Sequence, residues 1–328
     1  MANGKGLYNF TRINVPFAST HHVTIDCKVT TRRAEFLLML VTFIAAGGWL
    51  FSKSALAEFL PHSFVALRFT LAGVVLAVIF YRQISSLNVH QAIRCTVVGI
   101  VLGLALQVWV IALQQTEFIG EGSFLVSLTV ILVPLISWMF YGVRLTPALF
   151  VALIPAVLGL ACLFLERSFV LESSILYFLL ATVGFSLHLN MSVYYVRSIP
   201  PLALSAIQLT SAGLVSVLCT WAFESTDFMP MLQSVSATAW YWLLASSLIA
   251  TSLRFALQTQ ALQHLEASHA SMIFLAEPVF TTMLGALTLG ERMSVKQLLG
   301  CLLIFTSLLI FRGLPLIKQH LQRKRSRA

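Results

Sequence analysis

The stretch ALRFTLAGVV, residues 66–75, returns 140 positions later as AIQLTSAGLV, residues 206–215, with five of the ten positions identical. A second match joins residues 112–114 to residues 261–263, both of which read ALQ, and a glutamate follows each at the same spacing. The first pair lies within long apolar runs and the second pair lies at the ends of such runs, and the order is the same in the two halves of the chain. We therefore interpret the chain as two copies of one unit.

Composition places this duplicated unit in a membrane. Of the 328 residues, 58% are hydrophobic and only 10% are charged, whereas soluble domains average about 45–50% apolar and about 25% charged residues. A chain so rich in apolar side chains is not disordered. Its apolar runs are continuous and close to the roughly 20 residues that a membrane helix needs, unlike the short alternating segments of a β-barrel. We expect an all-α integral membrane protein.

Ten apolar segments are predicted to form transmembrane helices. The first matched pair falls in the second and seventh of them, so segments one to five repeat as segments six to ten. Because five is odd, the second copy enters from the opposite face of the membrane, which gives two inverted five-helix repeats, as in many secondary transporters. The segments cover residues 34–52, 63–81, 93–113, 122–141, 147–165, 174–194, 201–223, 238–260, 269–289 and 295–314.

Basic residues set the expected orientation. With the N-terminus in the cytoplasm, fifteen of the 21 lysines and arginines lie on the cytoplasmic side and four lie outside, while Arg68 and Arg254 fall within helices. Cytoplasmic loops normally carry such an excess, so we expect a multi-pass protein of the cell (plasma or inner) membrane with both termini in the cytoplasm. The expected parts are an N-terminal arm (1–33), a first repeat (34–165), a second repeat (174–314) and a basic tail (315–328).

An alternative interpretation of the N-terminus is a twin-arginine signal. Arg32 and Arg33 precede the first apolar run, and a small-residue cleavage sequence ends near Ala57. The partnership of the first segment with the sixth favours a helix that is retained in the mature protein.

Four motifs resemble the EamA-type drug/metabolite transporter family of the DMT superfamily, and the resemblance covers roughly residues 34–314. The family resemblance implies ten helices in paired repeats, a cavity between the halves, and export or exchange of small metabolites. The chain departs from the family at Val143, where Glu is frequent, and at His269, where Arg is frequent. The motifs are Leu67–Phe69 with Ala72 and Gly73, Gly122–Pro134, Leu257–Leu262 with Ala267–Ser271, and Glu277–Phe280 with Leu289–Arg292.

Ionisable groups inside a membrane are costly and are functional candidates by default. Glu277 lies about 12 Å from the cytoplasmic end of its segment, and Pro278 follows it and loosens the helix. This carboxyl could take a proton or a cationic group, and the competing interpretation is a side chain that caps backbone freed by the kink.

Arg254 and His188 have the same estimated depth, about 9 Å from the cytoplasmic end. Arg254 could pair with Glu277 or receive an anionic solute, and the alternative is an arginine that reaches the interface. His188, with Asn190 just beyond it, is either a substrate contact or a hydrogen-bonded packing residue. Gln258 near Arg254 is a candidate hydrogen-bonding residue of the same site.

Arg68 lies about 8 Å from the outer face. With Gln107 and Trp109 it could form an outer gate or substrate shelf, and the alternative is again an arginine that reaches the interface. Gly47 and Gly48 are predicted to permit bending of the first helix. The other tryptophans near segment ends, Trp49 among them, are predicted to belong to an aromatic belt.

No ATP-binding G-x-x-x-x-G-K-[ST] motif and no H-E-x-x-H metal motif occurs in the sequence, and no cofactor or metal is expected. The prediction is a secondary transporter, not an enzyme, that exports a small metabolite or drug-like solute by alternating access. Proton coupling and exchange both stay open. The expected partners are the solute, lipids and protons, with a homodimer left open and no nucleic acid. A non-transporting sensor or assembly protein, or a lipid-modifying enzyme using His188 and Glu277, is the alternative.

Overall fold

The computed structural model describes residues 24–115, 119–164, 173–289 and 294–325, and the regular secondary structure in these ranges is entirely helical. Two shorter apolar helices, Pro147–Cys162 and Val295–Phe311, accompany six longer ones in the described part. The protein is therefore a multi-pass helical membrane protein. The six stretches long and apolar enough to cross a membrane are Thr31–Ala55, Pro61–Ile79, Val89–Gln115, Gly122–Tyr141, Ser173–Tyr195 and Pro201–Phe223.

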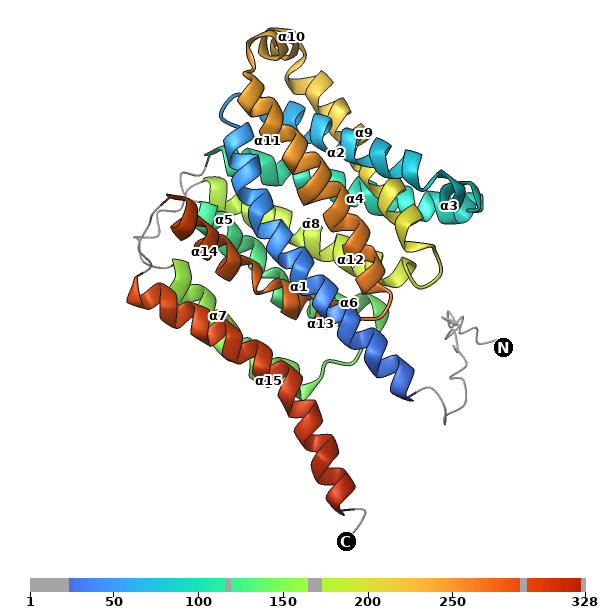
Figure 1. Cartoon of the computed structure of the whole chain (residues 1–328), viewed down its shortest axis with the longest axis vertical. Helices are drawn as coiled ribbons and strands as arrows, with labels where there is room; N and C mark the ends of the chain where they lie inside the picture. The colour runs from blue at the N-terminus through green and yellow to red at the C-terminus, as the bar shows by residue number, and fades with distance from the viewer. Residues whose placement is uncertain (1–23, 116–118, 165–172, 290–293, 326–328) are drawn as a thin grey trace, which may run out of the picture.

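All ten predicted segments fall on helices, and three of them are interrupted (Figure 1). The fourth segment is divided into α5 and α6, the eighth into α11, η1 and α12, and the ninth into α13 and α14. The elements are α1 (Thr24–Ala55), α2 (Pro61–Ile79), α3 (Tyr81–Ser85), α4 (Val89–Gln115), α5 (Ile119–Ser127), α6 (Thr129–Tyr141), α7 (Pro147–Phe164), α8 (Ser173–Tyr195), α9 (Pro201–Phe223), α10 (Ser225–Ser234), α11 (Ala237–Ser247), η1 (Leu248–Leu253), α12 (Arg254–Leu262), α13 (Ala267–Phe274), α14 (Glu277–Leu289) and α15 (Val295–Arg325).

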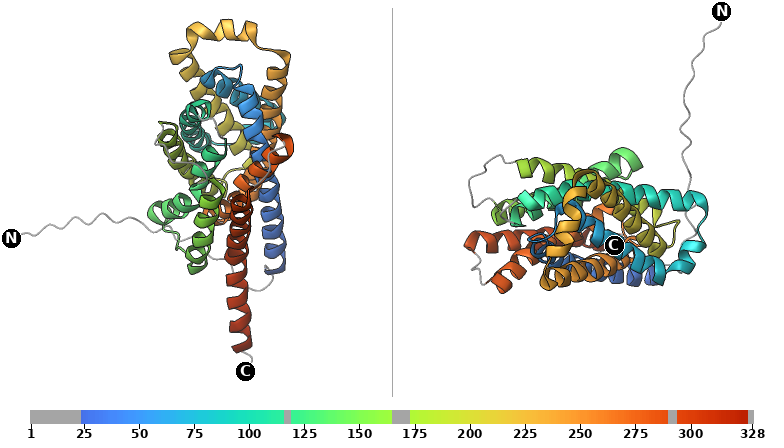
Figure 2. Two further views of the ribbon diagram at one scale, coloured as in Figure 1. Left: turned by 90° about the vertical axis from the view of Figure 1, so that its left-hand side faces the viewer. Right: turned by 90° about the horizontal axis from the view of Figure 1, so that it is seen from above.

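The first and last helices are longer than the sequence predicts. α1 begins ten residues before the expected start at residue 34, and α15 continues eleven residues past the expected end at residue 314. The expected N-terminal arm therefore contributes helix from Thr24 onward, and its residues 1–23 lie outside the described residues. Much of the expected basic tail is likewise a continuation of α15, which projects from one end of the molecule (Figure 2).

The π-helical turn η1 interrupts the eighth segment at its centre. Inside it, the hydroxyls of Thr251 and Ser252 donate to the carbonyls of Ser246 and Ser247, five residues earlier, at 2.9 and 3.0 Å. A π turn adds a residue to the helix and displaces the side chains around it, and such turns are frequent at functional sites. Here the displaced turn faces α1 and α2.

The ninth segment breaks between Phe274 and Glu277. α13 ends before the break, and α14 begins at Glu277 with Pro278 as its second residue. Proline lacks a backbone N–H, and the first turn of a helix is where that donor would have no partner within the helix. Pro278 is therefore accommodated in the first turn of a new helix, and the carboxyl of Glu277 sits at the positive end of that helix.

The helices α2 and α9, which share the most extensive contact in the described part, carry the two repeated stretches (Figure 1). A Cβ added at Gly73 would lie 2.5 Å from the backbone nitrogen of Thr210, and one added at Gly213 would lie 2.7 Å from that of Thr70. Only glycine allows two helix backbones to approach this closely. The contact is reciprocal, because Thr210 and Gly213 stand 140 positions after Thr70 and Gly73.

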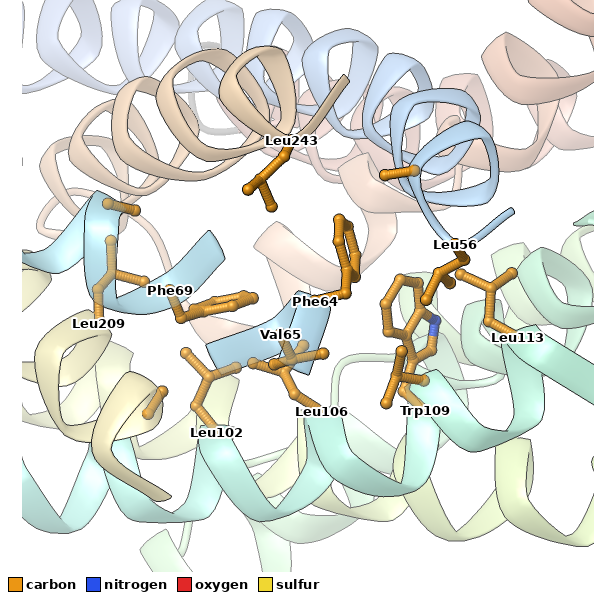
Figure 3. Packing of buried hydrophobic residues seen from close by; sticks show 14 of the residues in the cluster. Leu56, Phe64, Val65, Phe69, Leu102, Leu106, Trp109, Leu113, Leu209 and Leu243 are labelled. Atoms are coloured by element: carbon orange, nitrogen blue, oxygen red, sulfur yellow. The ribbon is translucent and has the colours of Figure 1, made fainter. Parts of the chain in front are cut away.

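Buried apolar side chains fill the space around this pair. Phe64, Phe69, Leu106 and Trp109 belong to one cluster between α2 and α4, and Leu243 of α11 closes it from the other side (Figure 3). The outward faces of the bundle are also apolar, and large side chains there are exposed, as expected for surfaces that contact lipid. Examples are Val78, Leu176, Leu218, Trp221, Leu287 and Leu302.

The loop carboxylates at one end of the bundle each cap a helix of the other half. Glu58, between α1 and α2, accepts the backbone N–H and hydroxyl of Ser236 at the start of α11, and these hydrogen bonds lower the pKa of Glu58. Glu224, after α9, accepts the backbone N–H groups of His62 and Ser63 and the Ser63 hydroxyl at the start of α2. The short helix α10 lies across this same end (Figure 2).

Candidate functional site

A cavity of about 150 Å³ lies among helices drawn from both halves of the chain. The first half contributes side chains from α1, α2, α4, α5 and α6, and the second half from α8, η1, α12, α13 and α14. The lining combines a polar set with an aromatic set. The polar residues are Ser52, Arg68, Thr129, His188, Arg254, Gln258 and Glu277, and the aromatic ones are Trp49, Phe69, Trp109, Phe185, Phe255 and Phe274.

Most of the candidate residues from the sequence meet at this cavity. Its lining includes Glu277, Arg254, His188, Gln258, Arg68, Trp109 and Gly48. Gln107 and Asn190 are buried but do not line it. Separate helices bring these groups together from positions 48 to 277 in the chain, so the site is a product of the tertiary structure.

Glu277 is held by a tryptophan of the other half. The indole nitrogen of Trp49 on α1 donates to Oε1 of Glu277 at 2.6 Å, and the Trp49 ring meets Trp109 edge to face with centroids 5.3 Å apart. Trp49 is only 5% exposed. Its expected place in an aromatic belt is therefore wrong, because the side chain turns into the bundle toward Glu277 and Trp109 and not outward to lipid.

Arg68 is fixed by hydroxyls from both halves of the chain. Its Nε donates to Thr251 of η1 and its Nη1 donates to Ser52 of α1, each at 2.7 Å. The guanidinium also lies 5.4 Å from the ring centroid of Phe69, within range of a cation–π contact. Arg68 is 6% exposed, so it is turned inward and does not reach the interface.

Arg254 has far fewer partners. Its guanidinium lies 5.2 Å from the ring centroid of Phe255, and its buried Nε has no hydrogen-bond partner among the described residues. Gln258, one helical turn further along α12, is 4% exposed, and its Oε1 likewise has no partner there. Arg254 and Gln258 therefore form a polar face of the cavity whose hydrogen-bonding capacity the described protein groups leave unused.

His188 is anchored from behind. Its Nε2 lies 3.1 Å from Oε1 of Gln208 and 3.2 Å from the hydroxyl of Ser192, and its ring packs against Phe255 with centroids 6.1 Å apart. Ser192 and Gln208 come from α8 and α9, so the imidazole has a defined orientation at the cavity wall.

The two remaining polar candidates tie helices together. Asn190 bonds the hydroxyl of Ser137 on α6, and its amide nitrogen donates to the carbonyls of Val133 and Ser186 at 3.1 and 2.9 Å. The contacts with Ser137 and Val133 join α8 to α6.

Gln107 joins α4 to α2 and α9. Its Oε1 lies 2.6 Å from Nδ1 of His62, and its Nε2 donates to Ser216 at 2.6 Å. The expected shelf of Arg68, Gln107 and Trp109 is therefore only partly assembled, since Gln107 does not reach the cavity.

The two glycines of α1 do not break that helix, which is continuous through Gly47 and Gly48. A Cβ at Gly48 would lie 2.9 Å from Cβ of Ala250 and 3.8 Å from Nη2 of Arg68. Gly48 thus lets η1 and Arg68 approach α1. Bending at this pair stays a prediction.

Comparison with known proteins places the chain among membrane transporters. The model of the EamA-like transporter family matches residues 32–165 and again residues 172–313. The "Uncharacterized transporter YoaV" of Bacillus subtilis (strain 168) is 23% identical over 81% of this chain and 92% of its own length. The "Uncharacterized transporter YcbK" of the same organism is 29% identical, over 38% of this chain and 40% of its own length. A solved crystal structure with 20% identity has the same fold, with a TM-score of 0.69 over 84% of this chain and 98% of the solved chain.

Proposed function

The chain belongs to the EamA-like transporter family, and we propose that it is a ten-helix secondary transporter that exports a small solute by alternating access through the cavity. In this proposal, residues 34–165 and 174–314 are inverted repeats, both termini are cytoplasmic, and the protein resides in the cell membrane. Glu277, Arg254, His188, Gln258, Arg68 and Trp109 contact the solute.

The packing of the helices supports the inverted repeat. In a molecule with a pseudo-two-fold axis, a contact between helix i of one half and helix j of the other recurs with the halves exchanged. The contact of α4 with α8 has its counterpart in α12 with α1, and that of α6 with α8 has its counterpart in α14 with α1. The pairs α2–α9 and α7–α15 join repeat partners directly.

The observation that carries the transport proposal is a cavity lined by polar and aromatic side chains, at which hydrogen bonds join the two halves. Trp49 of the first half holds Glu277 of the second, and Arg68 of the first half holds Thr251 of the second. Alternating access moves one half against the other around a central site. Such movement would break these hydrogen bonds and form others. The hydrogen bonds at the site would therefore differ between the two conformations of the transporter.

Export can be tested by profiling the medium of cells that overproduce the protein. We expect one or a few small metabolites to accumulate outside these cells, and not outside cells that overproduce the Arg254→Ala variant at equal membrane abundance. Each such metabolite should then show counterflow in liposomes that contain the purified protein. Equal metabolite concentrations in the media of both strains, together with no counterflow, would contradict the proposal. Product formation without flux would favour an enzyme.

A further inference from the structure

We propose that the solute is a small organic anion, a carboxylate on an apolar body, and that Arg254 is the residue that binds its charged group. This inference rests on the proposed function, since it names the substrate class of the same cavity. The protein's own groups satisfy the charged side chains of the cavity wall to different degrees, and Arg254 is the least satisfied.

The cavity carries more positive than negative charge. Among the described residues that line it, two guanidinium groups, those of Arg68 and Arg254, face one carboxyl, that of Glu277. The excess remains whether Glu277 is ionised or protonated. A charge held away from water is costly unless it is paired, so an anionic solute gains where a cationic one would not.

Two of these three groups are already occupied. Glu277 accepts the indole N–H of Trp49 and stands in the first turn of α14, whose dipole favours a negative group. Arg68 donates hydrogen bonds from Nε to Thr251 and from Nη1 to Ser52. Both side chains therefore have fixed positions in which protein groups fill part of their hydrogen-bonding geometry.

Arg254 is the exception. Glu277 is near enough to interact with it electrostatically, but Arg254 makes no ion pair within 4 Å among the described residues, and its Nε has no hydrogen-bond partner there. A guanidinium presents paired donors that match the two oxygens of a carboxylate. Gln258 lies on the same face of α12 and is almost fully buried with an unpartnered oxygen, so it offers a further hydrogen bond beside the anion.

The aromatic part of the cavity wall determines which uncharged group the solute can carry. Trp49, Trp109, Phe69 and Phe185 surround the cavity, and Phe274 and Phe255 complete it. Aromatic faces bind apolar and planar groups well and give little to a strongly hydrated one. The cavity of about 150 Å³ restricts the body to a small group, for which a single ring is a suitable probe.

Three probes that share a ring and differ in charge test the class. These are phenylacetate (anion), phenylacetamide (neutral) and phenethylamine (cation). A compound that binds the folded state raises its thermal stability with concentration, so the midpoint of unfolding of the purified protein in detergent gives an apparent Kd. We expect stabilisation by phenylacetate and at least about tenfold weaker binding of the other two.

Variants assign the anion to Arg254. Arg254→Gln should weaken phenylacetate binding at least about tenfold, Arg254→Lys should weaken it less, and Gln258→Ala should weaken it by a smaller factor. The control is Arg82→Gln, at an exposed arginine remote from the cavity, which should leave binding unchanged. Should Arg254→Gln not yield folded protein, the Arg254→Lys and Gln258→Ala ratios decide.

The proposal is overturned if phenylacetate does not bind, if the amide or the amine binds as tightly, or if the Arg254 variants bind phenylacetate like the unmodified protein. Counterflow of the same probes in liposomes separates this failure from that of the proposed function. If phenylacetate binds but shows no counterflow, the anion-site proposal stands and the transport proposal fails. If only phenethylamine shows counterflow, the transport proposal stands and the anion proposal fails.

Discussion

Arg68 and Gln208 occupy equivalent positions in the two halves, yet they do different work. Arg68 on α2 faces the cavity and is held by hydroxyls from α1 and η1. Gln208 on α9 is fully buried behind the wall and contacts His188. Around them the backbone contact is the same in both directions, with Gly73 on Thr210 and Gly213 on Thr70. The residues that determine how closely α2 and α9 approach are therefore the same in the two halves. The residues that determine the polarity of the cavity differ between them.

The largest effect is expected where the halves are equal. Gly73→Val and Gly213→Val each force a side chain into the opposite backbone, and each should cost about 3 kcal/mol of stability, the upper end of the usual cost of overpacking. The measurement is the thermal midpoint of the purified protein in detergent.

Gly285→Val is the matched control, because a Cβ at Gly285 meets nothing within 4 Å. Reciprocal packing requires the Gly73 and Gly213 variants to be similarly damaged. A large effect at one position and none at the other would show that the α2–α9 contact is not reciprocal.

The next effect compares the two unequal positions directly. Arg68→Gln removes two charge-assisted hydrogen bonds between helices, each worth about 1.5–3 kcal/mol, whereas Gln208→Leu removes one contact worth about 0.5–1.5 kcal/mol. We therefore expect the Arg68 variant to have the lower thermal midpoint. Part of its loss is offset, since a charge no longer has to be buried. The opposite order would mean that the burial cost outweighs the hydrogen bonds.

Glu277→Gln separates coupling from binding. The amide oxygen can still accept the Trp49 indole, so the fold should persist. If Glu277 carries protons, uptake driven by a pH gradient should be abolished while equilibrium exchange continues in the same liposomes. Loss of both activities at normal protein abundance would assign Glu277 to solute binding, and loss of expression would assign it to structure.

The smallest effect is expected at the two loop carboxylates that cap helices across the halves. Glu224 is buried and accepts three hydrogen bonds, whereas Glu58 is exposed and accepts two. Glu58→Gln should therefore lower the thermal midpoint less than Glu224→Gln.

The lowered pKa of Glu58 gives this cap a pH dependence. Its contribution is fully present above the ordinary glutamate pKa of 4.5 and is lost as the pH falls through the lower folded-state value. Thermal midpoints measured from pH 6 downward should therefore converge for the unmodified protein and Glu58→Gln. Midpoints that stay equally far apart at low pH would contradict this assignment.

Prediction from the sequence succeeded where the signal is additive along the chain. Apolar segments locate helices because every residue of the run contributes to its transfer free energy. Arg68, Arg254, His188 and Glu277 stood out because ionisable groups in such runs are expensive, and the structure brings all four to one cavity.

It failed where a residue looks ordinary in its own segment. Trp49 lies near the end of an apolar run and resembles an interfacial tryptophan, but its indole binds Glu277, 228 positions away. Thr251 is one of many hydroxyl residues in the second half, and only the π turn turns it toward Arg68. Gln107 and Asn190 look like polar site residues, yet the orientation of their helices turns both side chains away from the cavity and into hydrogen bonds between helices.

The sequence by itself determined that this chain crosses a membrane as helices, that its two halves are related, and which costly side chains need an explanation. These follow from hydropathy and from residue identity, which do not depend on neighbours in space. Only the tertiary structure decided which of those side chains are satisfied. A hydrogen bond exists or fails over a few tenths of an ångström, and that distance is set by how the helices turn and pack.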